Sequence, residues 1–170
     1  MKILGVDPGL RATGYGAIKV ENGIIRLMES GYIKTTPNLK RPERLFKLYS
    51  EFSNVLNRTL PDFVIIEHVF SLVRYPKAGI TLGQVLGILY LTICERRIRY
   101  LDLTPKEIKN AITGYGDAKK DQIKRAVLAI LGLDQLNSFH ASDALAAAVA
   151  GFFRITRGLK GDKVSLRSAY

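Results

Sequence analysis

The chain has 170 residues, of which 47% are hydrophobic and 24% charged, a balance that is typical of one globular domain and excludes a disordered chain. Lysine and arginine total 26 against 15 acidic residues, which gives a formal net charge of +11. Such a surplus repels itself and does nothing for folding. We therefore expect an anionic partner such as nucleic acid or an acidic membrane, and we favour nucleic acid; the alternative is a basic but unspecific surface.

The cellular setting follows from the cysteine count and the apolar runs. Cys94 is the only cysteine, so an internal disulfide is excluded and a reducing compartment is favoured. Asp7-Pro8-Gly9 interrupts the first apolar run too early for a signal peptide. The apolar run 80–94 contains Gln84 and is shorter than the about 20 residues that span a bilayer. We expect a cytoplasmic protein without membrane contact, and Cys94 in its core.

Three strands open the chain, at 1–6, 14–20 and 24–33. The second and third are joined through Asn22-Gly23, and both of these residues tolerate the positive φ of a tight hairpin turn. This pattern predicts an antiparallel meander. Apolar residues then recur at helical spacing on one side of the segment 45–56, which predicts an amphipathic helix.

The middle of the chain alternates strands and helices. Residues 63–67 are apolar on both faces, as expected of a central strand that helices cover on each side. A loop is expected around residues 74–77, then a long apolar helix over 80–97, and then a strand over 99–103.

Three helices follow. The first begins at Thr104-Pro105-Lys106-Glu107, a capping box with proline in the first turn, and ends near Gly114. The second begins near Lys119. The third, over 140–155, is rich in alanine and apolar nearly all round, so we expect it to be buried.

The order of these elements predicts an α/β fold, a mixed sheet with helices on both faces. We expect residues 1–157 to form one domain and the polar, basic residues 158–170 to form a frayed tail.

Three acidic residues lie where an acid is costly. Asp7 ends the first strand, Glu67 ends the buried strand, and Asp143 lies in the first turns of the buried last helix, on the same helix face as His140. The carboxyl ends of strands line the ligand crevice of an open α/β sheet, so Asp7 and Glu67 can share one site. The start of a helix beside them would add Asp143.

Clustered carboxylates repel one another unless a cation compensates, and oxygen ligands favour Mg²⁺ or Mn²⁺. Two such ions about 3.5–4 Å apart activate a water and stabilise the leaving oxygen of a phosphodiester. On a basic protein this predicts hydrolysis of nucleic acid. Each residue also has a purely structural interpretation. Asp7 would belong to a turn, and Glu67 would be the polar end of a strand. Asp143 would be an acidic residue near the start of a helix, and His140 a packed or capping residue.

The most specific of five motifs opens the chain, Gly5-Val6-Asp7-Pro8-Gly9-Leu10-Arg11-Ala12-Thr13-Gly14-Tyr15-Gly16. The other four are Ile65-Ile66-Glu67-His68-Val69-Phe70, the segment Leu82-Gly83-Gln84, the lysine-bearing stretch 109–120, and Ala141-Ser142-Asp143-Ala144-Leu145-Ala146. Together these five motifs resemble the RuvC family of Holliday junction resolvases. The resemblance covers nearly the whole chain.

The resemblance implies an RNase H-like fold with a five-stranded mixed sheet flanked by helices on both faces. It implies that Asp7, Glu67 and Asp143 are catalytic and hold two Mg²⁺ ions per subunit, with Mn²⁺ able to substitute. His140 departs from the many family members that carry a fourth Asp there. Imidazole can still bind a divalent ion or handle the proton of the water, so His140 joins the expected site without adding negative charge.

Aromatic and basic residues are expected to contact DNA. Phe70 matches the family's aromatic residue at the junction, where a ring stacks on an unpaired base; without the resemblance it is a core or hinge residue. Tyr75, with Arg74 and Lys77 in the same loop, is a second candidate.

Lys109 and Lys120 match basic residues near the scissile phosphate, with Lys119 beside them. The alternative for these lysines is a solvated helix face.

Gly79, Gly83 and Gly87 form a stripe on the long helix. The glycines alone slightly favour packing against the protein's own sheet. The family instead implies a homodimer, whose two sites match the two-fold symmetry of a four-way junction.

The sequence thus predicts a structure-selective endonuclease that resolves Holliday junctions in DNA recombination and repair, by paired nicks with 5′-phosphate ends. The family also implies the RuvA–RuvB branch-migration complex as a partner. Alternatives are a nucleotide-dependent phosphotransferase, which needs two such domains, a RuvC-like nuclease acting on RNA, and a catalytically silent junction-binding protein. We expect no nucleotide cofactor.

Overall fold

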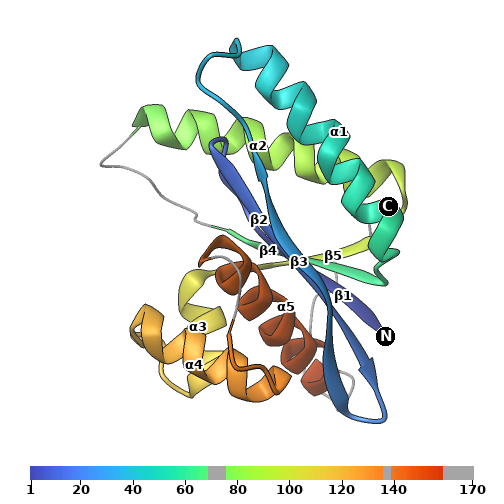
Figure 1. The fold of residues 1–170 in the computed structure, drawn as a ribbon, viewed down its shortest axis with the longest axis vertical. Coiled ribbons are helices and arrows are strands. Elements are labelled where there is room, and N and C mark those ends of the chain that lie inside the picture. Colours follow the sequence, from blue (N-terminus) through green and yellow to red (C-terminus); the bar gives the residue numbers. More distant parts are fainter. Residues whose placement is uncertain (69–75, 136–138, 159–170) are drawn as a thin grey trace.

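The computed structural model describes residues 1–68, 76–135 and 139–158 (Figure 1). Five strands form one sheet in the order β3-β2-β1-β4-β5. The strands are β1 (Lys2–Asp7), β2 (Ala12–Glu21), β3 (Ile24–Lys34), β4 (Phe63–Glu67) and β5 (Arg99–Leu103). The helices are α1 (Arg41–Thr59), α2 (Pro76–Glu95), α3 (Pro105–Thr113), α4 (Lys120–Leu131) and α5 (Phe139–Gly158). The predicted order of elements is confirmed.

The sheet is mixed, as predicted. β1, β2 and β3 form the antiparallel meander, and the turn between β2 and β3 has positive φ at both Asn22 and Gly23. β4 then pairs in parallel with β1, and β5 pairs in parallel with β4. β1 and β4 are therefore central parallel neighbours whose carboxyl ends reach the same edge of the sheet.

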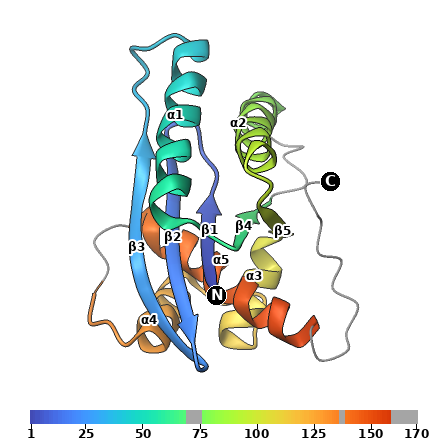
Figure 2. The same cartoon turned by 90° about the vertical axis from the view of Figure 1, so that its right-hand side faces the viewer.

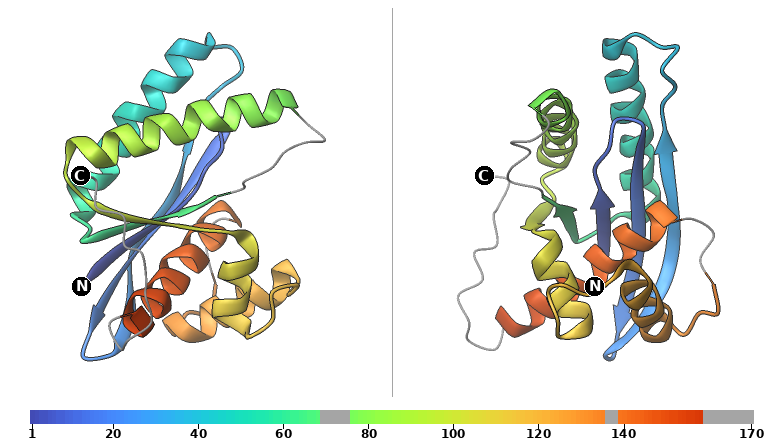
Figure 3. Two further views of the ribbon diagram at one scale, coloured as in Figure 1. Left: turned by 180° about the vertical axis from the view of Figure 1, so that it is seen from behind. Right: turned by 90° about the vertical axis from the view of Figure 1, so that its left-hand side faces the viewer.

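Helices cover both faces of the sheet. Figures 1 and 3 show α1 and α2 on one side and α3, α4 and α5 on the other, and Figure 2 shows α1 next to α2. β4 divides its side chains between the two cores: Phe63 and Ile65 pack with α5, whereas Val64 and Ile66 pack with α1 and α2. This alternation explains why β4 is apolar at every position before Glu67.

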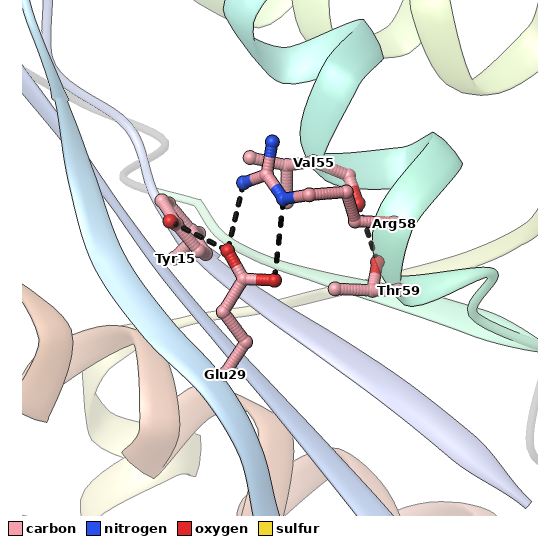
Figure 4. A network of polar contacts seen from close by, with 5 residues as sticks. All are labelled: Tyr15, Glu29, Val55, Arg58 and Thr59. Atoms are coloured by element: carbon pink, nitrogen blue, oxygen red, sulfur yellow. Dashed lines mark hydrogen bonds and ion pairs between the residues drawn. The ribbon is translucent and has the colours of Figure 1, made fainter.

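A polar network fastens the end of α1 to the sheet (Figure 4). Arg58 donates from both Nε (3.4 Å) and Nη2 (2.7 Å) to the carboxylate of Glu29, which also accepts from the hydroxyl of Tyr15 at 2.9 Å. The charge and hydrogen bonds of Arg58 hold the pKa of Glu29 below its usual value. Burial, followed by the contact with Glu29, raises the pKa of the Tyr15 hydroxyl. The network joins α1, β2 and β3.

Glycines let α5 lie directly against the sheet. A Cβ at Gly5 would lie 1.9 Å from the carbonyl oxygen of Ala144, and one at Gly16, the cross-strand partner of Gly5, would lie 2.6 Å from Leu145. Gly151 on α5 is equally tight against Ile65. The predicted burial of the last helix is confirmed, since nearly every residue from 141 to 151 is inaccessible.

α2 corrects three predictions. It begins at Pro76, so Lys77 lies in a helical turn and not in a loop, because proline fits the first turn of a helix. Cys94 is exposed. Gly83 and Gly87 do not pack on the sheet, since a Cβ at either would meet nothing within 4 Å. The helix is apolar nearly all round, so its pattern could not tell which side faces the sheet.

Candidate active site

The ends of β1 and β4 bring two carboxylates to one edge of the sheet. The last paired residues of these parallel strands are Val6 and Ile66, and Asp7 and Glu67 follow them directly. Ile65 faces the core beneath α5, so the alternation of the strand turns Glu67 to that same face. Asp7 and Glu67 are each half-buried.

α5 supplies the third carboxylate. Asp143 lies one residue before Ala144, the point at which α5 touches Gly5 of β1. The close approach that glycine allows therefore sets how near Asp143 comes to the strand ends. Its side chain is 32% exposed and accepts a hydrogen bond from Lys120 Nζ at 3.2 Å.

Glu67 and Asp143 share an open hollow with two lysines, one at the start of α4 and one in α3. Lys120 is 84% exposed and Lys109 is half-buried. The hollow is lined by Glu67, Pro105, Ile108, Lys109, Lys120, Ile123, Asp143 and Ala146.

Glu67 carries the strongest electrostatic signature in the hollow. Burial, followed by the negative charges of Asp7 and Asp143, raises its pKa from 4.5 to about 7, although Lys120 and Lys109 oppose the shift. A carboxyl whose ionised form is disfavoured by two other carboxylates is a site that a cation stabilises. Its oxygen donors fit a hard divalent ion such as Mg²⁺ or Mn²⁺.

The three carboxylates do not surround a single point in their present positions. Among the described side chains, no three acids, histidines or cysteines form a group that could hold an ion as they stand. Lys120 engages Asp143 instead, and this contact raises the pKa of the lysine. The ammonium thus supplies part of the positive charge that the cluster requires.

The raised pKa of Glu67 predicts how pH changes stability without a divalent ion. The folded protein holds this proton more tightly than the unfolded chain does, so stability falls as pH rises from 4.5 to about 7 and the loss is complete above that. Glu67→Gln should remove the loss and stabilise the ion-free protein at pH 8 by about 1–3 kcal/mol. The measurement is denaturant unfolding in EDTA at pH 5 and pH 8. Glu51→Gln, at an exposed position of α1, is the matched control. Equal effects of the two substitutions at both pH values would contradict the prediction.

The other predicted residues have mixed outcomes. Lys109 and Lys120 line the hollow, whereas Lys119 lies exposed at the N-cap of α4 and its backbone N–H bonds the side chain of Gln122. His140 belongs to the first turn of α5, but its side chain is outside the described part of the structure. Phe70, Arg74 and Tyr75 lie outside the described residues.

Two features of the site were not predicted from the sequence. One is the ion pair between Lys120 and Asp143, because the register of α4 against α5 is a tertiary property. The other is a hydrogen-bonded chain behind Glu67, in which His68 Nδ1 lies 3.0 Å from the Tyr90 hydroxyl and that hydroxyl donates to Asp102 at 2.8 Å. Strand alternation after Glu67 was the one available signal, since it turns His68 to the opposite face.

Carboxylates gathered at the parallel ends of this mixed sheet, with lysines around them, define the RNase H-like class of nucleases. The family model of crossover junction endodeoxyribonuclease RuvC matches residues 3–151. The chain belongs to this RuvC family. A relative from Caldicellulosiruptor saccharolyticus, a crossover junction endodeoxyribonuclease RuvC, is 38% identical over 151 residues, which cover 88% of this chain and 90% of that protein.

Solved structures agree with the family. Thermus thermophilus RuvC superposes on this chain with a TM-score of 0.86 at 30% sequence identity. The match covers 93% of this chain and 97% of the Thermus thermophilus chain. The structure of the same enzyme in complex with a Holliday junction substrate has a TM-score of 0.87 at 29% sequence identity. The match covers 93% of this chain and 96% of the Thermus thermophilus chain. The predicted family, the RNase H-like fold and the endodeoxyribonuclease class are confirmed.

Proposed function

We propose that the protein resolves Holliday junctions by metal-dependent hydrolysis of phosphodiesters in DNA recombination and repair, with Asp7, Glu67 and Asp143 as the metal-binding catalytic residues. The observation that carries the proposal is the position of Glu67 beside Asp7 and Asp143 on a chain of charge +11, where its own burial, followed by the negative charges of these two carboxylates, raises the pKa of Glu67 to about 7. Membership of the RuvC family supports it, as does the junction complex of the Thermus thermophilus relative.

Different residues of the chain hold the metal ions and bind the phosphate. Two divalent ions, Mg²⁺ or Mn²⁺, supply an activated water and stabilisation of the leaving oxygen when bound. The three carboxylates hold them, and His140 is a fourth ligand or accepts the proton of the water. Lys109 and Lys120, which both line the hollow, bind the scissile phosphate. Each nick leaves a 5′-phosphate.

The basic surface binds the junction. Lys77, Lys119 and Arg74 extend the positive charge beyond the hollow. Tyr75 is a further DNA contact, and Phe70 stacks on a base at the centre of the junction. This binding is electrostatic, so junction affinity falls steeply as salt rises. Residues 1–157 are the nuclease domain of this proposal, and the predicted basic tail 158–170 lies outside the described residues after Gly158, the last residue of α5.

A second copy of the chain covers the outer side of α2. Ile80 (63% exposed), Gly83, Gly87, Leu91 (54% exposed) and Cys94 form one exposed stripe along this helix. An apolar stripe that lacks Cβ atoms at its centre allows another helix to approach closely, and a two-fold dimer presents two equal sites to a four-way junction. By length and composition alone α2 could also cross a membrane. The DNA-cutting family and the charge of the chain favour the second copy.

Gly83→Leu should break the dimer without harming the subunit. Among the described residues, nothing outside the neighbouring turns of α2 lies within 4 Å of the added Cβ, whereas overpacking a helix pair costs about 1–3 kcal/mol, which weakens association roughly 5- to 150-fold. The measurement is sedimentation of the parent and of Gly83→Leu over a range of protein concentrations. Asn57→Leu on the exposed face of α1 is the control. An unchanged dimer in Gly83→Leu would show that α2 is not the interface.

Cytoplasmic location and a partnership with the RuvA–RuvB complex stay predictions that the family supports. The catalytically silent alternative is not favoured, because all three carboxylates are present at the site. The experiment that tests the proposed function is mapping of cut positions on a synthetic four-way junction. Paired nicks at symmetric positions, sealed by ligase without end repair, are expected. Unpaired cuts or 5′-hydroxyl ends would contradict it.

A further inference from the structure

A chain of three polar side chains lies on the side of the sheet opposite the hollow. It runs from His68, which follows β4, through Tyr90 of α2 to Asp102 of β5. The Tyr90 hydroxyl has one proton and donates it to the Asp102 carboxylate at 2.8 Å. At 3.0 Å from His68 Nδ1 it must then accept, so Nδ1 carries the proton. The hydrogen bonds therefore run in one direction, from His68 through Tyr90 to Asp102, and they fix the orientation of the imidazole ring.

His68 is held on its backbone as well. Its N–H donates to the carbonyl oxygen of Leu103 at 2.9 Å, which extends the ladder between β4 and β5 by one bond. Glu67 and His68 are consecutive, and strand alternation turns their side chains to opposite faces. Glu67 enters the hollow beneath α5, while His68 reaches α2. The peptide between them is therefore clamped from the side opposite the carboxylates.

The ring of Tyr90 and its hydroxyl have separate tasks. The ring packs against Tyr100 with centroids 5.3 Å apart, and this contact needs no oxygen. The hydroxyl adds a polar link between α2 and His68, the residue directly after β4. Tyr90 also lies three residues after Gly87, at the border between the buried side of α2 and its exposed stripe.

We propose that Tyr90 is a positioning residue for Glu67: its hydroxyl, anchored by Asp102, orients His68 and so fixes the end of β4 that carries the metal-binding carboxylate. The proposal rests on the proposed function, since it assumes that Glu67 binds the divalent ion. It also gives α2 a direct link from the candidate dimer surface to the catalytic edge. Partners of this kind, one step behind a metal ligand, change metal affinity or activity by roughly 10–100-fold when they are lost.

Tyr90→Phe tests the proposal, with Tyr100→Phe as its matched control. Both substitutions remove one hydroxyl from the same pair of contacting, tilted rings, but only the Tyr90 hydroxyl takes part in the hydrogen bonds to His68 and Asp102. We expect Tyr90→Phe to raise about tenfold the Mn²⁺ concentration for half-maximal binding, followed by electron paramagnetic resonance without DNA, and for half-maximal junction cutting. Junction affinity in EDTA and the melting temperature should stay near those of the parent. Tyr100→Phe should leave all four quantities unchanged.

Substitution of His68 separates hydrogen bonding from packing. His68→Asn keeps a polar atom near the place of Nδ1 and should bind Mn²⁺ nearly as the parent does. His68→Leu should match Tyr90→Phe, and the double variant should be no worse than either, because both break the same chain.

Three results would overturn the proposal. One is Mn²⁺ binding by Tyr90→Phe that equals the parent's. Another is an equal loss in Tyr90→Phe and Tyr100→Phe together with a lower melting temperature, which would make the pair a packing element only. The last is a parent protein that binds no Mn²⁺ and cuts no junction, and this alone would also remove the proposed function. If the parent cuts the junction and Tyr90→Phe binds Mn²⁺ and cuts as well as the parent does, only the role of Tyr90 is overturned and the proposed function is retained.

Discussion

Asp7→Asn is expected to abolish cutting of a four-way junction while leaving junction binding intact. The substitution keeps the shape of the side chain but removes one of the carboxylates that would hold the ions. Because an ion stabilises the developing charge by several kcal/mol and each step of about 1.4 kcal/mol is tenfold in rate, we expect a loss of roughly 10³-fold or more. The measurement is single-turnover cutting in Mg²⁺, next to junction affinity in EDTA.

Asp134→Asn is the control for this prediction, since it makes the same chemical change at an exposed position after α4. Loss of junction affinity in EDTA together with cutting would argue that Asp7 acts in folding or in DNA binding. Substantial cutting by Asp7→Asn would remove Asp7 from the catalytic set.

Gly5→Ala is expected to destabilise the protein by about 3 kcal/mol or more, although it adds a single methyl group. The added Cβ would lie 1.9 Å from the carbonyl oxygen of Ala144 and 2.5 Å from the backbone N of Ala148. These are backbone atoms of a buried helix and cannot turn away, so α5 must move off β1. That movement also displaces Asp143, and cutting should fall with stability.

Gly87→Ala makes the same change on the open side of α2 and should stabilise the helix by about 0.5–1 kcal/mol. Denaturant unfolding of both variants at two protein concentrations separates effects on the subunit from effects on association. A Gly5→Ala protein as stable as its parent would show that the close packing of α5 on β1 does not position the site.

The fold could be predicted where the signal is local. The turn at Asn22-Gly23, the capping box at Thr104 and the two-sided apolar strand β4 each depend on a few neighbouring residues, and the structure confirms them. The convergence of Asp7 and Glu67 was also predictable, because both residues end strands of one sheet.

What could not be predicted depends on packing between distant elements. α2 is apolar nearly all round, so no local pattern indicates that Gly83 and Cys94 are exposed. The contact between Lys120 and Asp143 needs the placement of α4 against α5. Tyr90 meets His68 only because β4, α2 and β5 are brought together on one face.

The most direct test of the central claim, that these carboxylates form a metal-dependent junction-cutting site, is one cleavage experiment. A synthetic four-way junction and a linear duplex of the same sequence are each incubated with the protein in Mg²⁺, in Mn²⁺ and in EDTA. We predict cutting of the junction alone, in a divalent ion alone. Tight junction binding with no cutting in either metal, or equal cutting of the duplex, would contradict the account.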